Sequence, residues 1–193
     1  MIEATEKDRD LVVTILVSAF KNIKEGNSIN LMLKQDSKRI QRMKVLMEFL
    51  FDNAIENGKV FLADSKNSCL LITYKYNNRD KLSSLINHVK LVYKCMGYTN
   101  LIMAIRRQLI MRKYAPKKDY IKPLIFAAKD GSKGKKSSGR LIIEVLKYYD
   151  ENRLPVIVDA VTTYNVKLYR KVGFKLIGEN SSLGYPIYFL RLN

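Results

Sequence analysis

Residues 124–142 read LIFAAKDGSKGKKSSGRLI, and this segment says most about how the chain folds. It opens with a short apolar run, Leu124–Ala128, which predicts a buried strand. The nine residues Gly131–Gly139 are only Gly, Ser and Lys, a composition that predicts a loop. Apolar residues at helical spacing then predict a helix: Leu141, Ile142, Val145, Leu146 and Tyr149. A second apolar run, Pro155–Asp159, follows, so the unit predicts two parallel strands joined by a helix.

The glycines and lysines of this predicted loop suit an anionic group. Gly134 and Gly139 permit close approach of the backbone, and the start of the following helix favours negative charge. Lys133, Lys135 and Lys136 add three cations. The spacing matches neither the GxxxxGK[ST] phosphate loop nor GxGxxG. The same composition is typical of a flexible surface loop, so the residues alone leave both interpretations open.

The flanking sequence predicts further elements on both sides of this unit. Apolar spacing predicts helices over residues 5–20, 37–57, 80–95, 99–113 and 163–171. Strands are predicted over residues 1–4, 59–64, 69–75, 174–178 and 185–191, some of them paired as hairpins. We therefore predict one domain, residues 1–193, of the α/β class with a mixed (α+β) sheet. Helices should cover both of its faces, and two of them, at about 80–113, precede the central strand.

The composition is that of a globular protein with an excess of positive charge. Of 193 residues, 47% are hydrophobic and 27% charged, and the formal net charge is +17. No run of eighteen apolar residues predicts a transmembrane helix, and the acidic start does not resemble a secretory signal. The stretch from Ala104 to Lys147 contains thirteen basic and three acidic residues, and this excess predicts attraction to an anionic partner.

The cysteine and histidine content argues against a metal site. Cys69 and Cys95 have no close spacing, which indicates two reduced thiols and a cytoplasmic protein. His88 is the single histidine, so a zinc site built from His and Cys is not expected. Nothing around His88 resembles the nucleophile turn of a Ser-His-Asp triad.

A second segment, residues 165–174, places two polar side chains together. Asn165 and Tyr169 are four residues apart and share one face of the predicted helix. Gly173 ends that helix and Phe174 begins the next strand. An amide beside a phenol is useful at a reaction site, although a surface helix with a glycine cap has the same pattern.

This Asn–Tyr–Gly–Phe pattern, shortly after a buried strand, resembles the last motif of the GNAT superfamily of acyl-CoA-dependent N-acetyltransferases. Residues 133–142 align without a gap with that family's pyrophosphate-binding loop, Q-G-x-G-x-G-S-x-L-L. Residues 114–179 are similar to the subgroup that includes puromycin N-acetyltransferase, chiefly through residues 114–118 and 155–162. The predicted order of elements also follows the GNAT order along nearly the whole chain, which implies a GNAT-like fold with a splayed mixed sheet.

The resemblance implies transfer of an acetyl group from acetyl-CoA directly to an amine. The backbone of Ala127 and Ala128 would hold the pantetheine arm between two strands that part. The loop would bind the pyrophosphate through Lys133, Gly134, Lys135, Lys136, Ser137, Ser138 and Gly139. Asn165 would bind the pantetheine or the opposite strand, and Tyr169 would protonate the departing thiolate. No metal is implied.

The amine must lose a proton, and two residues are candidates to accept it. Asp159 occupies the place of the subgroup's strand glutamate, and Tyr120 lies at the mouth of the neighbouring strand. Either could act directly or through water, and a structural role for the Asp159 carboxylate is the alternative. The acceptor, a small-molecule or peptide amine, is not readable from the sequence, and homodimerisation is left open.

The loop departs from the family pattern, which keeps two other functions open. Lys136 and Ser138 replace glycines, and Lys133 replaces Gln or Arg. A Cβ at Lys136 hinders close approach of the pyrophosphate, while the charge attracts it. The chain could therefore bind CoA without turnover. A basic nucleic-acid-binding domain is the other alternative, but no aromatic residues interleave with the basic run.

Overall fold

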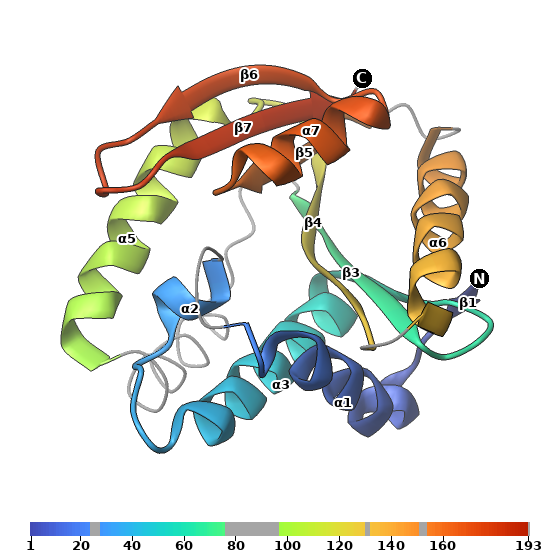
Figure 1. Ribbon diagram of the computed structural model, residues 1–193. Helices are drawn as coiled ribbons and strands as arrows, with labels where there is room; N and C mark the ends of the chain where they lie inside the picture. The colour runs from blue at the N-terminus through green and yellow to red at the C-terminus, as the bar shows by residue number, and fades with distance from the viewer. Residues whose placement is uncertain (24–27, 76–96, 130–131, 151–153, 193) are drawn as a thin grey trace.

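The computed structural model describes residues 1–23, 28–75, 97–129, 132–150 and 154–192, and their strands form one seven-stranded mixed sheet (Figure 1). The order is β1-β2-β3-β4-β5-β7-β6, and only the β4–β5 pair is parallel. The strands are β1 Ile2–Glu3, β2 Gly58–Leu62, β3 Ser68–Lys75, β4 Tyr120–Ala128, β5 Val156–Ala160, β6 Lys175–Asn180 and β7 Ile187–Leu192. The predicted mixed sheet is confirmed.

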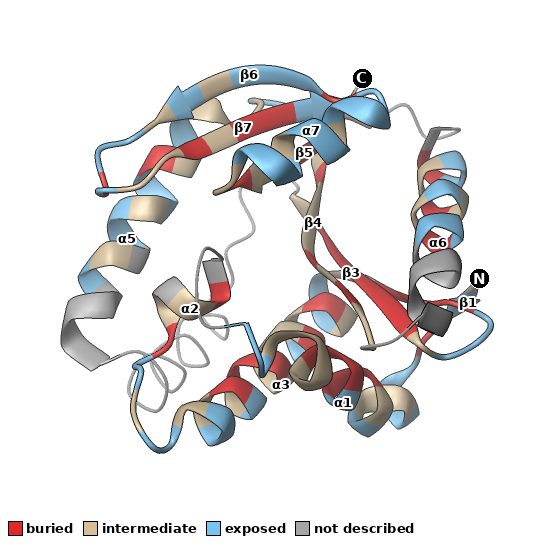
Figure 2. Cartoon of the chain, in the orientation of Figure 1, coloured by how far each residue is buried: buried red, intermediate tan, exposed pale blue. Residues whose placement is uncertain are grey.

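Helices cover both faces of this sheet, as predicted. They are η1 Glu6–Asp8, α1 Arg9–Phe20, α2 Ser28–Met32, α3 Arg39–Asn57, α5 Gly97–Tyr114, α6 Ser132–Asp150 and α7 Thr163–Lys171. The buried sides of α1 and α3 pack against β2, β3 and the end of β4, while α6 and α7 pack on the other face (Figure 2). Helix α5 packs against β7 through a smaller cluster that includes Ile110 and Phe189. Among the described helices, none is both long and apolar enough to cross a membrane.

The central feature of the sheet is the place where β4 and β5 part. Their one registered pair is Ile121 with Val156, at the start of both strands. Further along β4, Leu71 of β3 pairs with Ile125 and Ile72 with Pro123, so Leu124 is an extra residue in β4. Such a bulge bends its strand. The sheet is thus divided in two, with β1–β3 in one part, β5, β7 and β6 in the other, and β4 between them (Figure 1).

Two predicted segments differ from the structure. The segment predicted as a loop, Gly131–Gly139, is helical from Ser132, the first residue of α6. Glycine costs a helix about 1 kcal/mol relative to alanine but does not forbid it, and lysine is a good helix former. The buried residues Leu141, Val145 and Tyr149 anchor the helix that continues from this segment. Between the predicted helices at 5–20 and 37–57, where polar residues predicted no element, the structure has the short helix α2. The helix predicted at 80–95 lies outside the described residues.

Candidate active site

Lys122 and Asp159 lie on one face of the sheet where β4 and β5 part. Ile121 and Val156 both pack into the core beneath α6, so the next residue of each strand faces the opposite side. Asp159, three residues after Val156, faces that side as well. The face is covered by α5, because the Lys122 ammonium donates a hydrogen bond to the sulfur of Met111, at 3.6 Å.

The Asp159 carboxylate is held in an ion pair with Arg107 of α5. Both side chains are 13% exposed. Burial works to raise the pKa of Asp159, but the positive charges of Arg107 and Lys122 outweigh it and hold the pKa below its usual value. Nε of Arg107 is buried and has no hydrogen-bond partner among the residues that the structure describes. Tyr185, from the turn before β7, lies close enough that burial and both charges act on its pKa, which is raised.

Lys122 is the one charged residue of β4, and it is partly buried. Burial lowers the pKa of its ammonium to about 8. Attraction to Asp159 opposes that shift, whereas the positive charges of Arg107 and Lys75 reinforce it. A lysine of this kind is deprotonated to an appreciable extent near neutral pH, unlike an exposed one.

Helix α7 carries the two polar residues of the second predicted segment. Its N-terminus is capped by Thr162, whose hydroxyl accepts a hydrogen bond from the backbone N–H of Asn165 at 3.2 Å. Gly173 follows the helix with φ +96°, a conformation that favours glycine, so the predicted glycine end is confirmed. The Asn165 side chain is exposed.

Tyr169 faces the sheet rather than solvent. Its ring is partly buried against the core beneath α6 and α7, with its centroid 5.5 Å from that of Phe174. Burial raises the pKa of the phenol, and the negative charge of Asp159 raises it further. Helix α7 packs against β5, so Tyr169 lies beside the strand that carries Asp159.

The remaining predicted residues lie along β4 and α6. Tyr120 begins β4 opposite Lys75, and the backbones of Ala127 and Ala128 pair with Cys69 and Ser68 of β3. The predicted phosphate-binding residues occupy the first turns of α6: Lys133, Gly134, Lys135, Lys136, Ser137, Ser138 and Gly139. Asp159 and Tyr169 thus lie on opposite faces of the sheet, and the α6 residues follow the far end of β4.

Sequence reasoning missed three residues of this site: Arg107, Lys122 and Tyr185. The sequence does contain a signal for Lys122, because it is the single charged residue in a strand that is otherwise largely apolar. Arg107 left none, since α5 carries several exposed basic residues and its partner Asp159 is 52 residues away. In the part of the chain that the structure describes, no three His, Cys, Asp or Glu side chains gather as a metal site would require.

The fold is that of the GNAT acetyltransferases. A structure described as histone acetyltransferase HPA2 and related acetyltransferase from Corynebacterium glutamicum matches with a TM-score of 0.70 at 16% identity. The match covers 98% of this chain and 93% of that one. Arylalkylamine N-acetyltransferase 2 from Aedes aegypti matches with a TM-score of 0.67 at 12% identity, covering 99% and 96%.

Another solved structure extends this likeness to an enzyme with a different substrate. The Drosophila melanogaster polyamine N-acetyltransferase, described as forming N-acetylagmatine, matches with a TM-score of 0.57 at 13% identity, covering 99% and 97%. No protein-family model matches the chain, and no curated protein matches its sequence. At these identities the likenesses establish the fold alone.

Proposed function

We propose that this chain is an N-acetyltransferase that transfers an acetyl group from acetyl-CoA to an amine. The observation that carries the proposal is that β4 and β5 part after a single pair, with Asp159 in β5 and Tyr169 in the helix that packs on β5. Proteins with this fold and described as acetyltransferases support it, as does the Asn165–Phe174 segment. The similarity of residues 114–179 to the puromycin N-acetyltransferase subgroup suggests a place within the superfamily.

Tyr169 is proposed to be the general acid of this reaction. When the amine nitrogen attacks the thioester carbonyl, a C–N bond forms, the C–S bond breaks and the sulfur leaves as a thiolate. A phenol whose pKa is raised keeps its proton at neutral pH and can give it to that thiolate. Asn165, Ala127 and Ala128 are proposed to bind the pantetheine arm, and the first turns of α6 the pyrophosphate.

The residue that accepts the amine proton is less simply assigned. An ion-paired carboxylate with a lowered pKa is a weak base, so Asp159 could accept a proton only if its pair with Arg107 opened. Tyr120 stays a candidate at the start of β4. The proposal also includes a cytoplasmic location and an acceptor that is a small-molecule or peptide amine.

Thiol release tests this function directly. The protein is incubated with acetyl-CoA and, in turn, an arylalkylamine, agmatine and a peptide with a free N-terminus, and free CoA is measured with a thiol reagent. Release that depends on both the amine and the protein is expected. If CoA raises the melting temperature but no amine triggers release, the chain binds CoA without turnover. If oligonucleotides bind tightly and CoA does not, it is a nucleic-acid-binding domain.

A further inference from the structure

Lys122 occupies an unusual position for a charged residue. It is next to Ile121, the last residue of β4 that pairs with β5, and its side chain faces the same side as Asp159. Two residues later the bulge at Leu124 turns the rest of β4 away. Partial burial of the Lys122 ammonium costs free energy of folding, and a functional role of Lys122 would account for that cost.

Among the described residues, the groups around Lys122 give its nitrogen no strong partner. Met111 of α5 provides a sulfur, which is a weak acceptor. Asp159 of β5 attracts the ammonium, but its carboxylate forms a close ion pair with Arg107 of α5. Lys75 of β3 adds a further positive charge. Tyr185 lies at this cluster as well, and the charge of Asp159 also acts on Tyr169. Two cations therefore compete for one carboxylate, and Arg107 holds it.

We propose that Lys122 is the proton acceptor of this site. The inference rests on the proposed acetyltransferase function and deepens it. The neutral Lys122 Nζ takes one proton from the ammonium of the acceptor, which leaves a free amine to attack the thioester. Tyr169 supplies one proton to the thiolate, and the second proton, which leaves the nitrogen as the amide forms, returns through water to the Tyr169 oxygen. The net products are amide, CoA thiol and one proton, which Lys122 returns to solvent.

This role explains the Arg107–Asp159 pair as well. Arg107 neutralises the carboxylate that would otherwise hold the Lys122 proton in place, and its own charge disfavours a second ammonium nearby. In this arrangement Asp159 and Arg107 are positioning residues. A base that titrates near the working pH is the kind that serves general base catalysis best.

The first test measures Lys122 without any acceptor. The whole protein is labelled with trace acetic anhydride at a series of pH values, and the labelled peptides are quantified by mass spectrometry. The reactivity of Lys122 should rise with a midpoint well below that of Lys175, an exposed lysine of β6 that serves as the internal control. A Lys122 midpoint equal to that of Lys175 overturns the proposal, whether or not an acceptor is known.

The second test uses the amine that gives thiol release in the wild type. Lys122→Arg keeps the positive charge but cannot give up its proton, so kcat should fall about 10²–10⁴-fold with CoA affinity unchanged. The acid limb of the wild-type pH profile should be absent from the residual activity. If the arginine is too bulky for the site, Lys122→Met should show the same loss of kcat with CoA affinity unchanged. The control variant Lys175→Arg should match the wild type in both properties.

The outcomes separate this inference from the function on which it rests. If the wild type turns over and Lys122→Arg is equally active with the same acid limb, Lys122 is not the proton acceptor. The proposed acetyltransferase function is then unaffected. Absence of thiol release from the wild type with every amine overturns both. Loss of CoA binding in both Lys122 variants would show a structural role and would also overturn the proposal.

Discussion

Tyr169 differs from Tyr164, the other tyrosine of α7, in what surrounds its hydroxyl. Tyr164, on the same helix, is 69% exposed, whereas Tyr169 packs towards the sheet near Asp159. Tyr169→Phe keeps the ring and removes only the proton donor. We therefore expect kcat to fall about 10²–10⁴-fold with little change in CoA affinity, because the lost interaction belongs to the transition state. Steady-state kinetics and a CoA titration of the variant measure the two effects.

Tyr164→Phe is the matched control for this prediction. It removes a hydroxyl from the same helix, but from a ring that solvent surrounds, so kcat and thermal stability should equal those of the wild type. Full activity of Tyr169→Phe would assign Tyr169 to packing against Phe174 and would remove it from the proposed chemistry.

Lys122 should also affect stability, and in a pH-dependent way. Its pKa is about 8 in the folded protein and near the ordinary 10.5 when unfolded, so folding is penalised while both forms are protonated. The penalty is full below pH 8 and disappears as the pH rises to 10.5. Lys122→Met removes it, so the variant should exceed the wild type in free energy of unfolding most at pH 7 and less at higher pH. Urea titrations of both proteins at pH 7 and near pH 10.5 would measure the two differences in free energy of unfolding. A difference that is the same at the two pH values would contradict the prediction.

Single residues divide into those that the sequence could assign and those that it could not. Asn165, Tyr169 and Gly173 have a fixed local spacing, and their helix is where the sequence placed it, Thr163–Lys171. The pairing of Arg107 with Asp159 depends on how α5 crosses the sheet, which no local pattern encodes. The bulge at Leu124 could not be predicted either, because Leu124–Ala128 is apolar throughout and has no apolar–polar alternation that an extra residue would interrupt.

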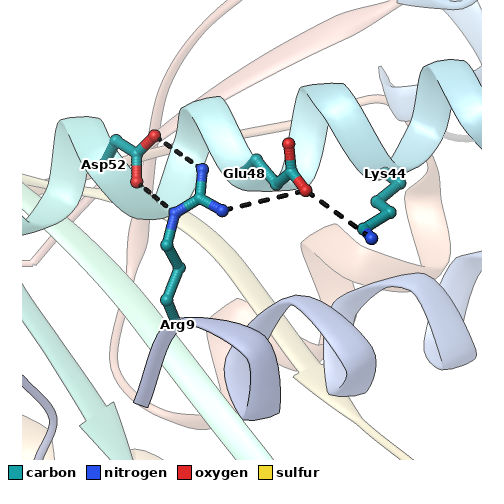
Figure 3. Close-up of polar contacts among 4 residues, drawn as sticks. All are labelled: Arg9, Lys44, Glu48 and Asp52. Carbon is teal, nitrogen blue, oxygen red and sulfur yellow. Dashed lines mark hydrogen bonds and ion pairs between the residues drawn. The ribbon is translucent and has the colours of Figure 1, made fainter. Parts of the chain in front are cut away.

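Among the elements, α1 and α3 show which interactions hold the fold together. Arg9 of α1 donates two hydrogen bonds to Asp52 of α3, at 2.8 and 2.9 Å, and lies 3.8 Å from Glu48, which also meets Lys44 (Figure 3). The Asp52 side chain is 55% exposed, so solvent screens this network. Beneath it, apolar side chains of both helices are buried against the sheet: Val12, Ile15 and Leu16 of α1 and Met43, Leu46, Met47 and Phe51 of α3.

Replacing one buried apolar residue and one residue of the ion-pair network should separate the contributions of apolar burial and of ion pairs to the free energy of unfolding. Leu16→Ala removes a side chain with no exposed surface and should cost about 2–5 kcal/mol in free energy of unfolding. Arg9→Ala breaks the exposed ion pairs and should cost about 0.2–1 kcal/mol, less at high salt. Urea denaturation of the two variants tests the order, and an Arg9→Ala loss as large as that of Leu16→Ala would contradict it.

The elements themselves were largely predictable, and the exceptions have a common cause. Helices and strands with a clear apolar period lie within a few residues of their predicted positions, as α3, β3 and α7 do. The Gly/Ser/Lys segment was predicted as a loop from its composition, yet it belongs to α6. Its helix is nucleated by the apolar residues that follow, so the deciding information lay outside the segment.

At the scale of the whole molecule, the net charge of +17 has to be matched to a partner. A surplus of ten positive charges falls between Ala104 and Lys147, a range that covers the C-terminal part of α5, all of β4 and most of α6. Those elements border the proposed active site, so the charge lies where a phosphate-bearing substrate would arrive. Nucleic acid would use the same charge, and ionic strength alone does not distinguish the two partners.

CoA and pantetheine together make that distinction. CoA at a hundred times its dissociation constant should stabilise the fold by about 2.7 kcal/mol. Its affinity should fall as the salt rises from about 0.1 M to about 1 M, because the screening length shrinks from roughly 10 Å to 3 Å. Pantetheine lacks the phosphates and should bind more weakly, with little dependence on salt. Melting curves with each ligand at both salt concentrations measure these differences. A melting temperature unmoved by millimolar CoA, together with tight, steeply salt-dependent oligonucleotide binding, would assign the charge to nucleic acid instead.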